Sequence, residues 1–130
     1  QAHGAEIKRK KIGSFGDVSI FSFCNDKIIT TGGEGGIFLT NNYNYFKIAW
    51  SYKDIGRNLN KVSKQKKKKN NKYIKIYDDI GSNFRMTEIQ SAIGLCFLKN
   101  LDADIIYRNK KAKLLNKLIF SKNKRPVLKP

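Results

Sequence analysis

Lys27 follows a run of β-branched and aromatic residues and precedes a glycine-rich turn, a placement that suits a covalent lysine. Residues 18–24 read VSIFSFC, and residues 32–36 read GGEGG. A turn of small residues lets a bulky ring approach the backbone, and burial would lower the pKa of the amine toward its neutral, nucleophilic form. A surface lysine before a glycine turn has the same pattern, so these residue types alone leave both interpretations open.

Other polar residues lie where they could bind a ligand, and each also has an ordinary structural interpretation. Ser22 could be a plain strand residue, Gln1 a polar loop residue and Asn83 a turn former. Arg85, two positions after Asn83, could make a structural ion pair. His3 fits a hydrogen-bonded structural histidine better than an acid or base.

The two cysteines predict neither a metal site nor a disulfide. Cys24 and Cys96 lie far apart and belong to no CxxC or Cys/His pattern. We expect reduced thiols in a cytoplasmic protein. No stretch approaches the roughly 20 apolar residues of a membrane helix, so no membrane partner is expected.

The candidate site residues need strands and helices to position them. The spacing of apolar residues along the chain predicts both, and so an α/β fold class. The length predicts one domain with its own core. Asn41-Asn42 can cap a helix, and Thr87 with Gln90 forms the pattern of a capping box. We expect a strand from Asp17, an extended piece at 28–31, a strand at 37–40, a helix over 43–53, and a helix from Thr87 that bends at 102–104.

The net charge of +17 comes from two Lys-rich segments. Residues 57–72 carry eight Lys or Arg and residues 108–130 carry nine, and neither segment contains Asp or Glu. Nucleic-acid readers use Arg forks or aromatic side chains within the basic patch, and the run Lys66–Lys69 has neither. We therefore favour solvated surface over a nucleic-acid partner, and expect residues 57–72 to form a polar loop.

Four motifs in the same order resemble the DegT/DnrJ/EryC1/StrS family of sugar aminotransferases. They are QAHGA at residues 1–5 with GSFGD at 13–17, FSFCNDKIITTGGEGG at 21–36, AWSYKDIGRN at 49–58, and GSNFRMTEIQSAIG at 81–94. The resemblance implies a pyridoxal 5′-phosphate enzyme of fold type I, with a mixed sheet flanked by helices. It implies transfer of an amino group, typically from glutamate, to a keto carbon of a nucleotide-linked sugar, for polysaccharide or glycan synthesis.

The resemblance also implies roles for individual residues. Lys27 matches the lysine that holds the cofactor as a Schiff base and later moves the proton of the amino donor. Ser22 matches a serine that binds the cofactor phosphate, and Gln1 matches a glutamine at the cofactor ring. Asn83 matches an asparagine that reaches the phosphate in the neighbouring subunit, which implies a homodimer with shared sites. Arg85 would support that loop or meet a charge on the substrate.

The resemblance further implies that the chain is an internal piece of a longer enzyme. The family's acidic partner of the pyridine nitrogen would lie three positions before Gln1. Residues 1–56 would be part of the cofactor-binding large domain, 57–72 the Lys-rich loop, and 73–130 an interface loop and long helix. We expect the piece to be inactive alone. The alternatives are a basic nucleic-acid-binding module and a non-catalytic fragment of a broken gene.

Overall fold

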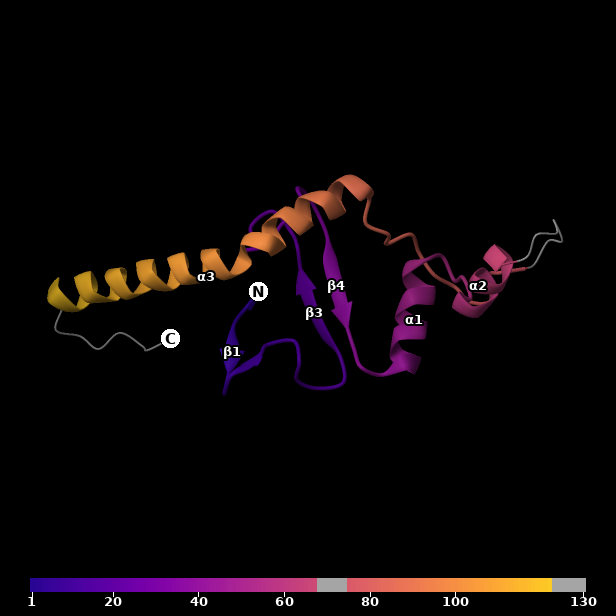
Figure 1. The fold of residues 1–130 in the computed structure, drawn as a ribbon, viewed down its shortest axis with the longest axis horizontal. Coiled ribbons are helices and arrows are strands. Elements are labelled where there is room, and N and C mark those ends of the chain that lie inside the picture. The colour runs from indigo at the N-terminus through magenta and orange to yellow at the C-terminus, as the bar shows by residue number, and fades with distance from the viewer. Residues whose placement is uncertain (68–74, 123–130) are drawn as a thin grey trace.

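The computed structural model describes residues 1–67 and 75–122 of the chain. Within these ranges the α/β class is confirmed, because short antiparallel strands precede three helices (Figure 1). The elements are β1 (Glu6–Ile7), β2 (Lys10–Lys11), β3 (Ser19–Ser22), β4 (Gly36–Leu39), α1 (Tyr43–Lys53), α2 (Leu59–Lys67) and α3 (Glu88–Lys122). β1 pairs with β2 and β3 pairs with β4, so each sheet of the described part has two strands.

β3 and β4 form the hairpin that carries Lys27 in its connecting loop. Ser22 pairs with Gly36 at the loop end of the hairpin. A side chain at Gly36 would lie 2.9 Å from the carbonyl oxygen of Phe21, so only glycine fits beside β3 at this point. The predicted extended piece at 28–31 is not a strand; it folds back as a loop, with Thr31 buried and its amide donating to the carbonyl of Phe23 over 3.1 Å.

The predicted helix over 43–53 is confirmed as α1, with its expected cap. The Oδ1 atom of Asn42 accepts hydrogen bonds from the amides of Asn44 at 2.9 Å and Tyr45 at 3.3 Å. These bonds satisfy two amides that the first turn of a helix leaves without a partner. The cap therefore fixes where the chain turns from β4 into α1.

The prediction of a loop over residues 57–72 is wrong for residues 59–67, which form α2. Asn58 caps this helix, since its Oδ1 accepts from the amides of Asn60 at 3.0 Å and Lys61 at 3.1 Å. Lys and Gln are good helix formers, so a good cap and helical propensity outweigh the polar composition. Residues 68–72 of the predicted loop lie outside the described residues.

α3 begins with the predicted capping box. The amide of Gln90 donates to Oγ1 of Thr87 at 3.2 Å, and the amide of Thr87 donates to Oε1 of Gln90 at 3.0 Å. α3 continues as one helix through residues 102–104, where the sequence predicts a bend, so the helix does not end there. The segment contains no Pro or Gly that would interrupt the ladder of hydrogen bonds. Among the helices described here, none combines the length and apolar character that a bilayer crossing requires.

The expectation of a self-contained core is wrong for the described part of the chain. Ile29 is its one buried apolar residue, whereas Ile20, Ile48 and Ile89 are 75%, 67% and 75% exposed. Two-stranded sheets and an extended helix do not enclose a volume (Figure 1), and apolar faces of this kind need further layers to cover them. The described elements therefore present surfaces that are suited to packing against more polypeptide.

Candidate active site

Lys27 lies in the loop after β3 with most of its side chain covered. Its side chain keeps 14% of its exposed area, and its Nζ atom lies 2.6 Å from Oδ1 of Asp26. This hydrogen bond raises the pKa of Lys27 above its ordinary value, and the opposing effect of desolvation is smaller. The expectation that burial would lower the pKa of this amine is therefore wrong, because the neighbouring carboxylate stabilises the charged form.

Ser22 ends β3 and faces the same loop. Its Oγ atom accepts a hydrogen bond from the amide of Cys24 at 3.3 Å. A hydroxyl that accepts one bond still has its own proton to donate. Ser22 can therefore offer a donor to an anionic group next to the loop that carries Lys27.

His3 packs against two aromatic rings at the end of the same strand and just after it. Its ring centroid lies 5.2 Å from that of Phe21 and 5.9 Å from that of Phe23. Burial is the main cause of a lowered pKa, and the charge of Lys27 adds to it. The Ser22 backbone lies close enough to oppose this shift, but neither ring nitrogen meets hydrogen-bond geometry within the described residues. The buried structural histidine is therefore present, and its hydrogen bond stays a prediction.

Gln1 is exposed and lines a cavity of about 590 Å³ between the N-terminal segment and α3. His3 and Ile28 also line this cavity, together with Asp102 and Arg108 of α3. Lys27 and Ser22 are not part of its wall. Gln1 and Ile28, the residue after Lys27, thus line one cavity, and the amine of Lys27 is not part of it.

Asn83 and Arg85 are brought together on the segment that precedes α3. The Nε atom of Arg85 donates to Oδ1 of Asn83 at 2.9 Å and lies 3.3 Å from Oδ1 of Asp54. Arg85 also lines a cavity of about 540 Å³ beside β3 and β4, with Phe21 and Gly36 in its wall. The ion pair that was the ordinary interpretation of Arg85 is present, and it leaves Asn83 on the surface. The site residues therefore form two groups, Lys27 with Ser22 and Asn83 with Arg85.

Comparisons with known proteins match this chain to one family of enzymes. The model of the DegT/DnrJ/EryC1/StrS aminotransferase family matches residues 1–128. The chain belongs to this family. Among curated relatives of this aminotransferase family, the chain is 36% identical to a GDP-perosamine synthase of Escherichia coli O157:H7, over 93% of the chain and 30% of the relative. It is 32% identical to an L-glutamine:2-deoxy-scyllo-inosose aminotransferase of Streptoalloteichus tenebrarius, over 97% of the chain and 29% of the relative.

A solved aminotransferase shares the fold. The crystal structure of the aminotransferase from Psychrobacter cryohalolentis matches with a TM-score of 0.85 and 36% identity, covering 93% of this chain and 30% of that one. The chain spans about 30% of the length of the curated relatives it matches.

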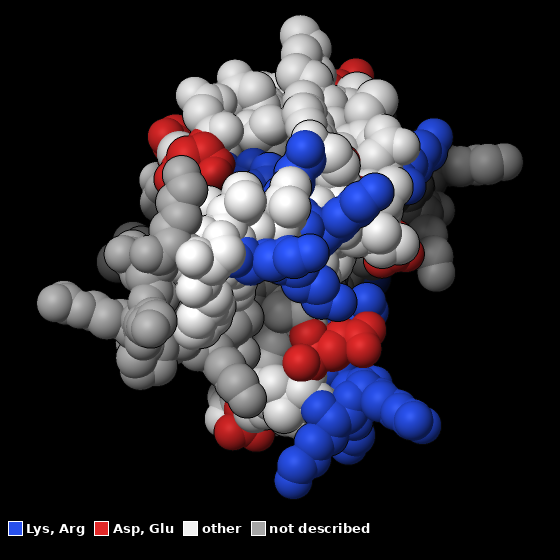
Figure 2. Space-filling model, turned by 90° about the vertical axis from the view of Figure 1, so that its left-hand side faces the viewer, with Lys and Arg blue, Asp and Glu red and all other residues white. Residues whose placement is uncertain are grey.

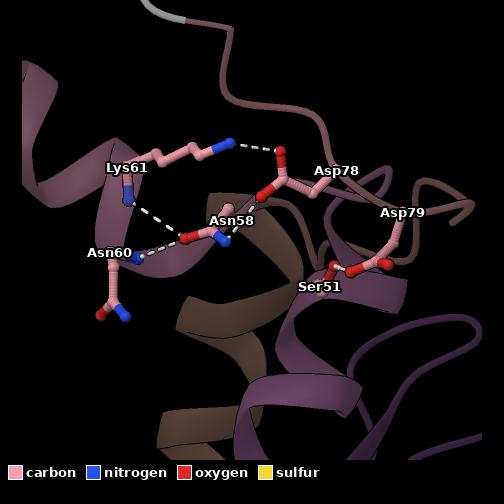
Figure 3. A network of polar contacts seen from close by, with 6 residues as sticks. All are labelled: Ser51, Asn58, Asn60, Lys61, Asp78 and Asp79. Carbon is pink, nitrogen blue, oxygen red and sulfur yellow. Dashed lines mark hydrogen bonds and ion pairs between the residues drawn. The ribbon is translucent and has the colours of Figure 1, made fainter.

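Sequence reasoning missed a polar network that joins α1 and α2 of this family member to Asp78 and Asp79 (Figure 3). Oγ of Ser51 donates to Oδ2 of Asp79 at 3.2 Å, and Nδ2 of Asn58 donates to Oδ2 of Asp78 at 2.7 Å. Lys61 forms an ion pair with Asp78 at 2.5 Å. The only sequence signal was the pair of adjacent acidic residues Asp78-Asp79 opposite a Lys-rich segment. The network binds the start of the predicted loop into the fold.

Proposed function

We propose that this chain is part of a pyridoxal-phosphate-dependent aminotransferase that transfers an amino group to a keto carbon of a nucleotide-linked sugar. The observation that carries the proposal is a lysine, Lys27, whose side chain is 14% exposed in the loop after β3. In the same loop the amide of Cys24 donates to the Ser22 hydroxyl, and the carbonyl of Cys24 accepts from the amide of Lys27. Membership of the DegT/DnrJ/EryC1/StrS family and similarity to a GDP-perosamine synthase support it.

The polar groups of the two clusters suit a cofactor that carries a phosphate. Ser22 has a hydroxyl proton to donate, and Arg85 holds the amide oxygen of Asn83, which leaves its NH₂ group to serve as a donor. Phosphate oxygens accept hydrogen bonds, so the Ser22 hydroxyl and the Asn83 NH₂ group could both donate to them. Gln1 would lie at the cofactor ring. When bound, the cofactor supplies an electron-accepting ring that stabilises negative charge on the carbon that loses a proton.

Lys27 would act first as the attachment point and then as the group that moves a proton. Its amine must lose a proton before it can form a covalent bond, and Asp26 opposes that loss by hydrogen bonding to the charged form. A raised pKa also suits an amine that takes a proton from the α carbon of an amino donor and holds it before returning it. Asp26 therefore makes attachment slower and proton retention easier.

The donor, the acceptor and the assembly belong to the same proposal. We infer glutamate as the amino donor; glutamine is the alternative, because the printed name of one relative specifies it. The acceptor would be a nucleotide-linked sugar for polysaccharide or glycan synthesis in the cytoplasm, as the GDP-perosamine relative suggests. Asn83 would reach the phosphate in the other subunit of a homodimer, so each site would need two chains. Residues 1–130 alone would be inactive.

The basic surface gives little support to the alternative of a nucleic-acid-binding module. Figure 2 shows one face on which a group of acidic side chains lies between two groups of Lys and Arg side chains. Glu6 pairs with Lys11 at 2.8 Å, and in the Lys-rich segment Arg57 and Lys61 pair with Asp54 and Asp78. A surface that reads nucleic acid needs its cations free to contact phosphates.

The test is reductive trapping in the enzyme completed to the length of its relatives. Borohydride reduction after addition of pyridoxal phosphate should fix the cofactor to the peptide that contains Lys27, as mass spectrometry would show. Lys27→Ala should abolish the label and the visible absorption band, whereas Lys53→Ala, a lysine of α1, should keep both. Labelling of another lysine, or no label at all, would contradict the proposal.

A further inference from the structure

Asp54 ends α1 as a buried carboxylate held between two arginines. Its side chain is 7% exposed, with Oδ2 at 3.5 Å from Nη1 of Arg57 and Oδ1 at 3.3 Å from Nε of Arg85. Removing a carboxylate from water costs several kcal/mol unless partners compensate for it. The positive charges of the two guanidinium groups provide this compensation, although Oδ1 accepts no hydrogen bond within the described residues. In return the carboxylate restricts where the two groups can lie.

Arg85 connects this carboxylate to the side chain of Asn83. Its Nε atom donates to Oδ1 of Asn83 at 2.9 Å, and its backbone amide donates to the same oxygen at 3.4 Å. Because arginine has donors and no acceptor, these bonds require the amide oxygen of Asn83, not its nitrogen, to face Arg85. The NH₂ group of Asn83 therefore points the other way, as a hydrogen-bond donor.

The backbone ties the same two segments together on both sides of Asn83. Asp54 and Asn83 form an antiparallel bridge. The amide of Ile55 donates to the carbonyl of Ser82 at 3.1 Å, and the amide of Phe84 donates to the carbonyl of Lys53 at 3.0 Å. Ile55 has a φ of 54°, which is unfavourable for a β-branched residue. Such a conformation persists only where its surroundings over-determine it, so Asp54 and Asn83 are held in a fixed relation.

We propose that Asp54 is a positioning residue for the cofactor-binding asparagine. Asp54 fixes Arg85, and Arg85 turns the amide of Asn83 so that its NH₂ group can donate to a phosphate oxygen. The inference rests on the proposed function, in which Asn83 contacts the cofactor phosphate. Asp54, a buried side chain that does not touch the cofactor, would in this way contribute to cofactor affinity.

A double-mutant cycle on the completed enzyme tests this inference through cofactor affinity. The apoenzymes of wild type, Asp54→Asn, Asn83→Ala and the double variant would be titrated with pyridoxal phosphate, and the dissociation constant read from absorbance. We expect each single change to weaken binding about tenfold, or roughly 1.4 kcal/mol. The double variant should bind as Asn83→Ala does, because Asp54 acts through Asn83. Equal weakening by Asp54→Asn in both backgrounds, or none in either, would overturn the inference.

Two further variants separate positioning from general loss of stability. Arg85→Lys keeps a positive charge beside Asp54 but loses the Nε donor that bonds Asn83, so it should weaken cofactor binding with the apoenzyme's melting temperature near that of wild type. Asp78→Asn makes the same chemical change as Asp54→Asn in a carboxylate that pairs with Lys61, and it should leave cofactor affinity unchanged. If Asp78→Asn weakens binding as much as Asp54→Asn, the inference fails. Failure of the proposed function would appear separately, as loss of Lys27 labelling in the wild-type enzyme.

Discussion

The ammonium nitrogen of Lys27 lies 2.6 Å from the carboxylate of Asp26, the residue directly before it in the chain. Adjacent residues seldom pair this closely on a regular strand, because successive side chains point to opposite faces. Here both residues lie in the turn that follows β3, where the chain reverses. This neighbouring carboxylate raises the pKa of the candidate catalytic amine above its ordinary value.

Replacing Asp26 with Asn should make Lys27 reactive at lower pH. The carboxylate raises the pKa of Lys27 by hydrogen bonding to its charged form, so its removal lowers that pKa. In the completed apoenzyme, the pH at which an amine-reactive reagent half-modifies Lys27 should move down, as peptide mass spectrometry would show. Asp102→Asn, which removes a carboxylate of α3, is the control and should leave the profile unchanged. An identical profile in Asp26→Asn and wild type would contradict the assignment.

The same ion pair has a defined effect of pH on stability. Because the folded-state pKa of Lys27 is raised, its contribution to stability is fully present below the ordinary value of 10.5 and is lost as pH rises through the folded-state value. Asp26→Asn should therefore reduce the loss of melting temperature that wild type shows on moving from neutral to strongly alkaline pH.

At a cofactor concentration too low to fill the Asn83→Ala site, mixing the Asn83→Ala and Lys27→Ala variants should restore activity if Asn83 serves the site of the partner subunit. A heterodimer of an Asn83→Ala chain and a Lys27→Ala chain has one site in which both changes coincide and one in which neither occurs. Amino transfer to a keto sugar should therefore return on mixing and reassembly, toward about a quarter of wild-type activity for random pairing. Recovery of no activity from folded dimers would show that both residues act within one subunit.

The helix starts that were predicted from the sequence depend on short-range hydrogen bonds. Asn42 at the start of α1 and the Thr87–Gln90 pair at the start of α3 act over three residues, and the sequence displays both partners together. The family motifs gave the candidate site residues in the same way, as local patterns around Lys27 and Asn83. These parts of the structure were therefore predictable.

The parts that sequence could not provide depend on contacts between distant segments. Asp54 meets Arg85 across 31 positions, a distance that no motif spacing reveals. The cap of α2 was missed because Asn58 lies at the start of a Lys-rich segment whose composition is typical of a loop. The direction of the Lys27 pKa shift was wrong because burial and a neighbouring carboxylate act in opposite senses, and only geometry shows which is larger.

The ion pair between Lys61 and Asp78 should give α2 a measurable sensitivity to acid. Hydrogen bonding with Lys61 is the main cause of a lowered pKa for Asp78. This contribution is present above the ordinary value of 3.8 and is lost as pH falls through the lower folded-state value. Lys61→Gln should lower the melting temperature at neutral pH and reduce its further drop in acid. Lys64→Gln, an exposed position of the same helix, should change neither; equal effects of both variants would contradict the role of the pair.

Gly56 and Gly16 offer a matched test of how tightly the Asp54 segment is packed. Both have a left-handed backbone, with φ of 74° and 73°. An added methyl group at Gly16 would meet only a carbonyl oxygen at 3.9 Å, whereas at Gly56 it would overlap the backbone of Asp79. Gly16→Ala should therefore cost only the left-handed conformation, about 1–2 kcal/mol. Gly56→Ala should cost about 1–3 kcal/mol more, because backbone cannot move aside as a flexible side chain can. Free energies of unfolding from urea titrations would measure both, and equal losses would mean that residues 54–57 can separate from residues 78–79 without disturbing the fold.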